Sequence, residues 1–333
     1  MVLLAVAEAT TSLKPAAPPP AGLKLKGGAR RATRRVEVGA LVSTWYALNV
    51  LYNVQNKKVL RTVDLPWCVA VIQLLVGAAY SQAAWALGRP GPASLFKAMA
   101  ASSGIAICHG AGQACTVIAL GAGAVSSAHV VKALEPLFSA IVSAVVFKTV
   151  MHPLVYASLL PVVGGVALAV AKDLAFNPVS FGTAMAANLL FACRAVFSKR
   201  AMQTSPLDDL PASSLFGVVT AGAALATLPV ALAIEGPHIA ARLAAVPPEH
   251  KLRLALLTLS SGLFHYLNNE VMYLTLGQVH PVTLAVANTI KRIVIILASL
   301  AVLGESMAPL AAIGAAVAIS GTFAYSYLKQ ILA

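Results

Sequence analysis

The sequence predicts an all-α membrane protein with ten transmembrane helices, arranged as two five-helix repeats of opposite orientation. Three observations lead to this prediction. The 333 residues are 59% hydrophobic and only 11% charged. Apolar stretches long enough to cross a bilayer recur along nearly the whole chain. The second half of the chain also repeats the side-chain pattern of the first half at a constant offset.

The composition excludes a soluble protein of this length, whose surface would need more polar cover than these residues provide. The mean hydropathy is +0.82. The cysteines lie inside apolar stretches and lack the spacing of a metal site or a disulfide framework, so we interpret them as packing residues and predict no metal or cofactor. They are Cys68, Cys108, Cys115 and Cys193.

The net charge of +13 would suit a nucleic-acid partner, but the positions of the basic residues do not. Seven of the 24 Lys and Arg residues lie in the N-terminal tail. Most others border apolar stretches, where they reach the headgroups and orient the chain in the membrane. The expected partner is therefore the lipid bilayer, and no nucleic acid.

Ten apolar stretches are candidates for membrane helices, and short connections at 120–123 and 277–280 fold a helix back on the next. Residues 1–36 are basic and rich in Ala and Pro, which indicates an N-terminal tail or a short targeting segment. The repeats then occupy 37–175 and 176–333. The predicted helices are 37–56, 66–87, 97–119, 124–147, 152–171, 178–198, 212–234, 254–276, 281–303 and 308–328.

The repeat is visible when the chain is compared with itself at an offset of 156 residues. Because each repeat has an odd number of helices, the second must enter the membrane upside down relative to the first. Inverted repeats around a midplane site are typical of secondary transporters. The aligned pairs include His109 with His265, Leu120 with Leu276, Gly121 with Gly277, Ser143 with Ser299, Pro153 with Pro309, and Gly165 with Gly321.

Six ionisable residues lie well inside the predicted helices. Burying a cation at a helix centre costs about 2.5–3.5 kcal/mol, so four of them cost roughly 10–14 kcal/mol. The two acids leave a surplus of about two positive charges, which would suit a doubly negative phosphate held by the planar fork of Arg and the point charge of Lys. The six are Lys132, Glu135, Arg194, Glu270, Lys291 and Arg292.

Structural alternatives exist for these charges. Glu135 is the expected i,i+3 partner of Lys132. Glu270 is a candidate partner for the adjacent cations of the ninth predicted helix, although one carboxylate cannot satisfy two side chains that point about 100° apart. Arg194 could instead extend towards the end of its helix. The three histidines His109, His129 and His265 are interpreted as packed and hydrogen-bonded.

Four segments resemble the plastid phosphate translocator family of the drug/metabolite transporter superfamily, and they are spread over nearly the whole chain after residue 37. The resemblance implies a carrier rather than an enzyme, and the chain lacks an H-E-x-x-H motif. It implies exchange of triose phosphate, 3-phosphoglycerate, phosphoenolpyruvate or a sugar phosphate for inorganic phosphate by alternating access. The segments are Trp45–Lys58, His129–Pro136, Arg194–Met202 and Asn288–Arg292.

The resemblance also implies the site. Lys132, Lys291 and Arg292 would hold the phosphate, and a second set would face the rest of the substrate: Thr116, Gln113, His129, Arg194, Tyr266, Asn268 and Asn288. Members of the family commonly carry a histidine where Gln113 stands and a tyrosine where Asn268 stands. Tyr266, half a turn away, is the candidate to supply that phenol.

The resemblance favours the plastid inner envelope as the location. A nucleotide-sugar carrier of the Golgi or endoplasmic reticulum shares the fold and is the main alternative. A proton-coupled exporter, with Glu135 and Glu270 as proton sites, is a further one. The sequence leaves monomer and homodimer both open.

Overall fold

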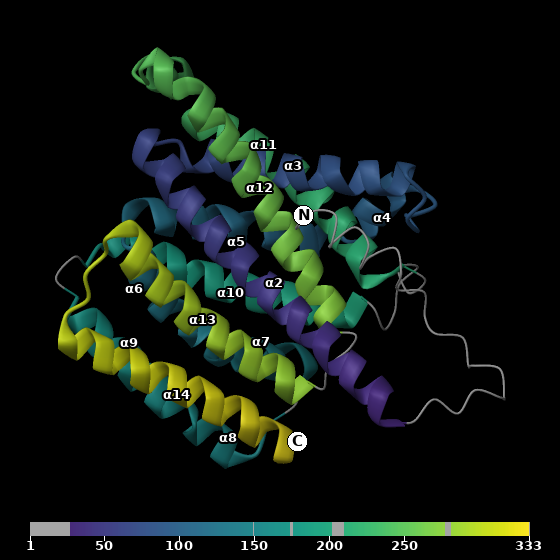
Figure 1. Cartoon of the computed structure of the whole chain (residues 1–333), viewed down its shortest axis with the longest axis vertical. Coiled ribbons are helices and arrows are strands. Elements are labelled where there is room, and N and C mark those ends of the chain that lie inside the picture. The colour runs from purple at the N-terminus through teal and green to yellow at the C-terminus, as the bar shows by residue number, and fades with distance from the viewer. Residues whose placement is uncertain (1–26, 149, 174–175, 202–209, 277–280, 333) are drawn as a thin grey trace.

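The computed structural model describes residues 27–148, 150–173, 176–201, 210–276 and 281–332, and every element in these ranges is a helix (Figure 1). The all-α prediction is therefore confirmed for the described residues. Most of the predicted tail and the turn predicted at 277–280 lie outside them.

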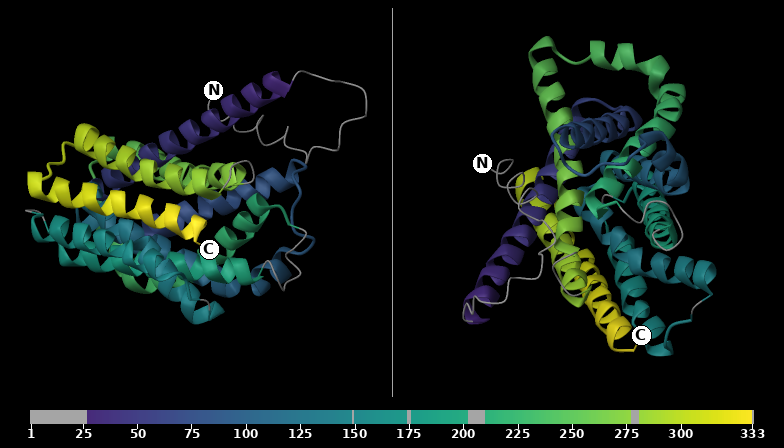
Figure 2. Two further views of the ribbon diagram at one scale, coloured as in Figure 1. Left: turned by 90° about the horizontal axis from the view of Figure 1, so that it is seen from below. Right: turned by 90° about the vertical axis from the view of Figure 1, so that its right-hand side faces the viewer.

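The first half contains several helix breaks. The predicted helix 124–147 divides at the 3-10 turn Lys132–Leu134, directly before Glu135-Pro136, because proline lacks the backbone N–H that would continue the hydrogen-bond ladder. The first helix, in contrast, begins before residue 37, and its first turns project from the bundle (Figure 2). The elements are α2 (Gly27–Thr62), α3 (Pro66–Ala86), α4 (Leu95–Ala101), α5 (Ser103–Ala122), α6 (Val125–Val131), the 3-10 turn η1 (Lys132–Leu134), α7 (Glu135–Phe147), α8 (Pro153–Ala157) and α9 (Leu159–Ala171).

The helices of the second half are unbroken. All but one begin with a proline, which suits the first helical turn because its missing N–H would have no partner there. The exception, α11, instead contains Pro229 and Pro237 in its interior and extends ten residues beyond its predicted end at 234. The elements are α10 (Pro178–Ala201), α11 (Ala212–Ala244), α12 (Pro248–Leu276), α13 (Pro281–Leu303) and α14 (Pro309–Ile331).

Eight helical segments of the described chain are long and apolar enough to cross a membrane. They correspond to α3, α5, α6 with α7, α8 with α9, α10, α11, α13 and α14. The long helices α2 and α12 are not among them, because Asn, Gln, His and Tyr side chains interrupt their apolar sequences. These two helices pack along each other, so their polar side chains face the interior of the bundle.

The helices pair across the two halves of the chain. The most extensive contacts join α10 to α5, α12 to α2, α14 to α9 and α11 to α3 (Figure 1). Lys57 of α2, the chain segment 119–127, Asp173, Ser180 and Glu305 meet at one end of the bundle, which we call the α5–α6 end. Because each pair has one helix from the first half of the chain and one from the second, both halves border the space between the pairs.

Candidate functional site

A polar cavity of about 140 Å³ lies inside the bundle. Its walls come from α2, α5, α6, η1, α7, α10, α12 and α13, so both halves of the chain contribute. The lining residues are Asn49, Tyr52, Asn53, His109, Gln113, Thr116, His129, Lys132, Glu135, Phe191, Arg194, His265, Asn268, Asn269, Lys291 and Arg292.

The cavity carries more surplus positive charge than the sequence predicted. Four cations line it, and Glu135 is the only acid among the lining residues, which leaves three positive charges. Glu270, counted before as a second acid, lies elsewhere: its Oε1 is 2.6 Å from Nη1 of Arg89, which follows α3. Glu270 therefore partners neither cation of α13, and that alternative is wrong.

The single acid of the cavity has a different partner from the predicted one. Glu135 Oε2 accepts a hydrogen bond from Arg292 Nη2 at 2.6 Å, which joins α7 to α13. Lys132 Nζ donates to Thr116 Oγ1 of α5 at 2.9 Å instead. Sequence spacing reveals only partners on the same helix, whereas tertiary packing brings a guanidinium to this carboxylate from the other half of the chain.

The other two cations lie against aromatic rings. Lys291 Nζ is 4.5 Å from the centre of the Trp45 ring and 3.2 Å from Asn288 Oδ1. The Arg194 guanidinium lies 5.0 Å from the Phe191 ring, with Nη1 3.0 Å from His109 Nδ1. Arg194 thus lies in the cavity rather than extending to the helix end. Ring faces attract cations but carry no net charge, so the surplus remains.

Neutral hydrogen-bonding groups form the rest of the wall. Gln113 Nε2 donates to the Tyr52 hydroxyl at 2.9 Å and to Gln73 Oε1 at 2.8 Å. His129 Nε2 lies 2.9 Å from Asn53 Oδ1. Gln113 and Tyr52 therefore belong to a buried network that spans three helices and fixes their side chains.

Three ring nitrogens beside the cavity are buried and have no hydrogen-bond partner in the described part of the chain: His109 Nε2, His129 Nδ1 and His265 Nε2. Buried polar atoms nearly always have a partner in folded proteins. These nitrogens are therefore available to water or to a bound molecule. Among the described residues no group of three His, Cys, Asp or Glu side chains is placed to hold a metal ion.

Eight of the ten site residues predicted from the sequence line this cavity. Tyr266 does not: it is buried against the rings of Tyr80 and Phe216, at 5.1 and 5.2 Å between centres. The phenol that lines the cavity is Tyr52 of α2. Asn288 contacts the Lys291 ammonium without lining the cavity.

The sequence analysis did not identify the contribution of α2 to the cavity. Asn49, Tyr52, Asn53 and Asn56 recur at i, i+3, i+4 and i+7, which places them on one face of the helix. A polar stripe of this kind within an apolar segment indicates a wet interior face, and it could have revealed the first three as cavity residues.

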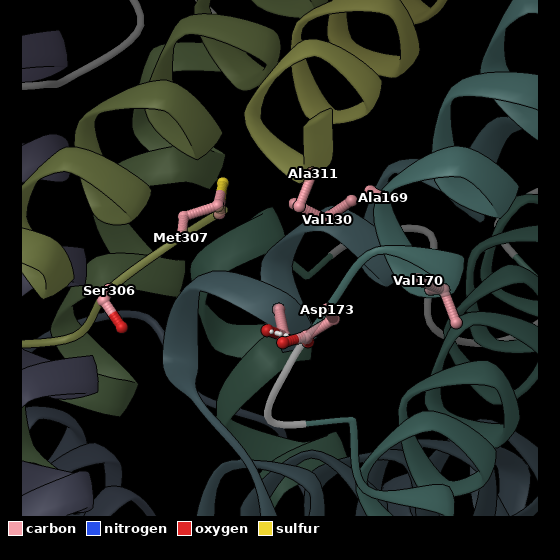
Figure 3. Close-up of a pocket in the computed structure, with 8 residues that line it drawn as sticks. Val130, Ala169, Val170, Asp173, Ser306, Met307 and Ala311 are labelled. Atoms are coloured by element: carbon pink, nitrogen blue, oxygen red, sulfur yellow. Dashed lines mark hydrogen bonds between the residues drawn. The ribbon is translucent and has the colours of Figure 1, made fainter. Parts of the chain in front are cut away.

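The α5–α6 end of the bundle is closed by contacts between the two halves and by a contact within the first half. The Glu305 carboxylate accepts hydrogen bonds from the backbone N–H groups of Val125 and Ser126 at 2.7 and 2.9 Å. Ser127 Oγ donates to Asp173 Oδ2 at 2.6 Å. Figure 3 shows the space beside Asp173, which is only about 20 Å³ and is too small for a metabolite.

Comparison with known proteins gives a consistent result. The model of the Triose-phosphate Transporter family matches residues 36–326. A chloroplastic glucose-6-phosphate/phosphate translocator of Arabidopsis thaliana is 33% identical over 90% of this chain and 76% of its own. A chloroplastic triose phosphate/phosphate translocator of Zea mays is 33% identical over 98% and 82%. A chloroplastic phosphoenolpyruvate/phosphate translocator of Oryza sativa is 35% identical over 88% and 75%.

Among the solved structures that match is a crystal structure with a TM-score of 0.54 and 16% identity, covering 89% of this chain and 99% of its own. This likeness supports the fold alone. The family match covers the cavity and the segments on which the resemblance was based. Together with the apolar helices, the chloroplastic relatives indicate a multi-pass membrane protein of the plastid. The chain therefore belongs to the triose-phosphate transporter family.

Proposed function

We propose that this protein is a secondary carrier that exchanges a phosphorylated small metabolite for inorganic phosphate by alternating access. The candidate metabolites are triose phosphate, 3-phosphoglycerate, phosphoenolpyruvate and sugar phosphates, and the names of the relatives mention all of these except 3-phosphoglycerate. The observation that carries this proposal is the cavity itself, where four cations face a single carboxylate inside the bundle.

Lys132, Lys291 and Arg292 bind the phosphate in this proposal. Glu135 contacts one guanidinium nitrogen of Arg292, so the other N–H donors of Arg292 remain for phosphate oxygens. The rest of the substrate faces Arg194 and the neutral wall, which includes Thr116, Gln113, His129 and Asn268, with Tyr52 in place of Tyr266. The histidine nitrogens without partners would accept or donate hydrogen bonds to the carbon skeleton.

The proposed architecture has ten membrane spans in two inverted repeats, 37–175 and 176–333, preceded by a tail or targeting segment over 1–36. The helix pairing supports it. Exchanging the two halves turns the α2–α12 pair into α10–α5, and the α3–α12 pair into α11–α5, and all four pairs are in contact. The α3–α11 and α9–α14 pairs each map onto themselves.

Strict exchange follows from the charge of the empty cavity. Closing both ends around three unpaired positive charges would bury them away from water, at a large free-energy cost. A bound phosphate dianion removes most of that cost, so the loaded carrier changes conformation and the empty one rarely does. No coupling ion is needed in this mechanism.

Counter-exchange in proteoliposomes tests the proposal. Uptake of labelled phosphate should require internal phosphate or one of the candidate metabolites, and comparing these identifies the substrate. Lys291→Gln should abolish uptake with every internal partner, whereas Lys97→Gln should not, because Lys97 is exposed on α4 away from the cavity. Equal uptake into empty vesicles would disprove strict exchange.

We place the carrier in the inner plastid envelope. Competition of uptake by a nucleotide sugar, but by none of the candidate phosphates, would instead support the nucleotide-sugar carrier. Uptake that depends on a proton gradient would support the exporter.

Oligomeric state is read from the same purified protein by size-exclusion chromatography with light scattering, which separates monomer from homodimer.

A further inference from the structure

A second and larger cavity is a groove on the outside of the bundle, and its volume is about 680 Å³. We call it the apolar groove. It lies between α3, α11 and α12, and its lining residues are Val63, Leu65, Cys68, Val69, Val71, Ile72, Leu75, Leu228, Ala231, Leu232, Ile239, Leu243, Lys251, Leu254, Ala255, Thr258 and Leu259.

The groove exists because α11 and α12 separate above α3. Helix α11 packs mainly along α3 and α5 and only lightly along α12. Pro229 and Pro237 interrupt the hydrogen-bond ladder of α11 beside the groove, and proline is the usual cause of a helix bend. In the right-hand view of Figure 2, the green helices α11 and α12 form an arch over α3.

The side chains of the groove exclude a polar ligand. The Thr258 hydroxyl donates to the Leu254 carbonyl of its own helix at 2.8 Å, so it is already satisfied. Cys68 has a weakly polar thiol, and the other lining residues except Lys251 are apolar. An apolar surface of this kind, on a protein that crosses a bilayer, suits a hydrocarbon chain.

The length of the groove fits one lipid leaflet. From Lys251 to Leu259, α12 rises by about 12 Å at 1.5 Å per residue. The hydrocarbon core of one leaflet is about 15 Å deep. Lys251 is exposed, and it lies near the connection between α11 and α12, whose Val246 packs with Val63 and Val117 towards the α5–α6 end of the bundle. The groove therefore runs from the headgroup level into the hydrocarbon layer.

Charge selects the headgroup. Lys251 is the only charged residue among those that line the groove. An ammonium at headgroup level attracts anionic lipids. We propose that the apolar groove binds one acyl chain of an anionic phospholipid whose phosphate contacts Lys251. This lipid site is separate from the polar cavity and does not depend on the transported substrate.

Native mass spectrometry of the delipidated full-length protein tests the proposal, with phosphatidylglycerol and phosphatidylcholine of identical acyl chains as probes. Phosphatidylglycerol should bind more tightly. Lys251→Gln should weaken phosphatidylglycerol binding about fivefold and phosphatidylcholine binding less, because choline already compensates the phosphate charge that both lipids carry. Arg253→Gln is the matched control, since Arg253 is exposed on the same turn but points about 200° away and does not line the groove.

A second pair of variants tests the groove itself. Ala255→Phe should fill it and reduce binding of both lipids, whereas Leu256→Phe, at an exposed neighbour outside the groove, should not. If Ala255→Phe does not fold, the exposed Lys251 variant still decides the matter. Equal binding of the two lipids, equal effects of Lys251→Gln and Arg253→Gln, or displacement of phosphatidylglycerol by inorganic phosphate would overturn the proposal. So would a dimer that Ala255→Phe dissociates while lipid binding stays unchanged.

Discussion

A methyl group added at Gly165 tests how closely α9 and α14 approach each other. The Cβ of an alanine there would lie 2.6 Å from the Gly314 carbonyl oxygen and 2.9 Å from Ala318 Cα, and nearer still to the Ala318 nitrogen. All three are backbone atoms, so no side-chain rotation can relieve the contact. The two helices would have to move apart, although small residues at this interface allow the close packing that membrane helices depend on.

The neighbouring Gly164 provides a matched control, because a Cβ at that position would meet nothing within 4 Å. Alanine favours a helix over glycine by about 0.8–1 kcal/mol in both variants, so this effect cancels in the comparison. Overpacking typically costs about 1–3 kcal/mol. We therefore expect the free energy of unfolding of Gly165→Ala to be lower than that of Gly164→Ala by about 1–3 kcal/mol.

The assay is unfolding of the purified protein in mixed micelles by titration with sodium dodecyl sulfate, followed by circular dichroism. Gly314→Ala, whose Cβ would lie 2.6 Å from the Gly165 carbonyl oxygen, should behave like Gly165→Ala. Equal stability of the Gly164 and Gly165 variants would refute the reasoning, since it would mean that α9 and α14 do not touch at these glycines.

Three further predictions follow from single contacts. Glu270→Gln should lower the free energy of unfolding by about 1.5–3 kcal/mol, because it removes the charge that Arg89 contacts, but the KM for phosphate should not change. A changed KM would mean that Glu270 takes part in substrate binding. Glu305→Ala should cost about 0.5–2 kcal/mol of stability through loss of the α6 cap, measured in the same titration, and an unchanged midpoint would contradict the role of the cap. Tyr52→Phe should lower the free energy of unfolding by about 1–3 kcal/mol, because one Gln113 N–H loses its buried acceptor. A variant as stable as the unsubstituted protein would show that this hydrogen bond is absent.

The membrane class and the cationic site could be predicted from the sequence because both depend on the transfer free energies of individual residues. A long apolar segment has a low free energy only in lipid or in a core, and a charge within it is expensive wherever the helix lies. Lys132, Lys291 and Arg292 were identified on that basis and by the family resemblance, and all three line the cavity.

Partners across the bundle could not be predicted in the same way. Glu135 was paired with Lys132 by its spacing, yet it contacts Arg292, which is 157 residues away. Tyr266 was chosen for its closeness in sequence to Asn268, but its helix turns it towards Tyr80, and Tyr52 of α2 lines the cavity instead. Only the packing of helices decides which faces meet.

The sequence alone determined that this chain is helical, that it belongs in a membrane, and that cations lie inside apolar helices, where burying them costs free energy. These properties follow from composition, helical period and the transfer free energy of single residues. The tertiary structure decided that Glu270 contacts Arg89 outside the cavity, that three surplus charges share one space, and that α11 and α12 separate into a groove. Those facts depend on distances between residues far apart in the chain, which no local pattern encodes.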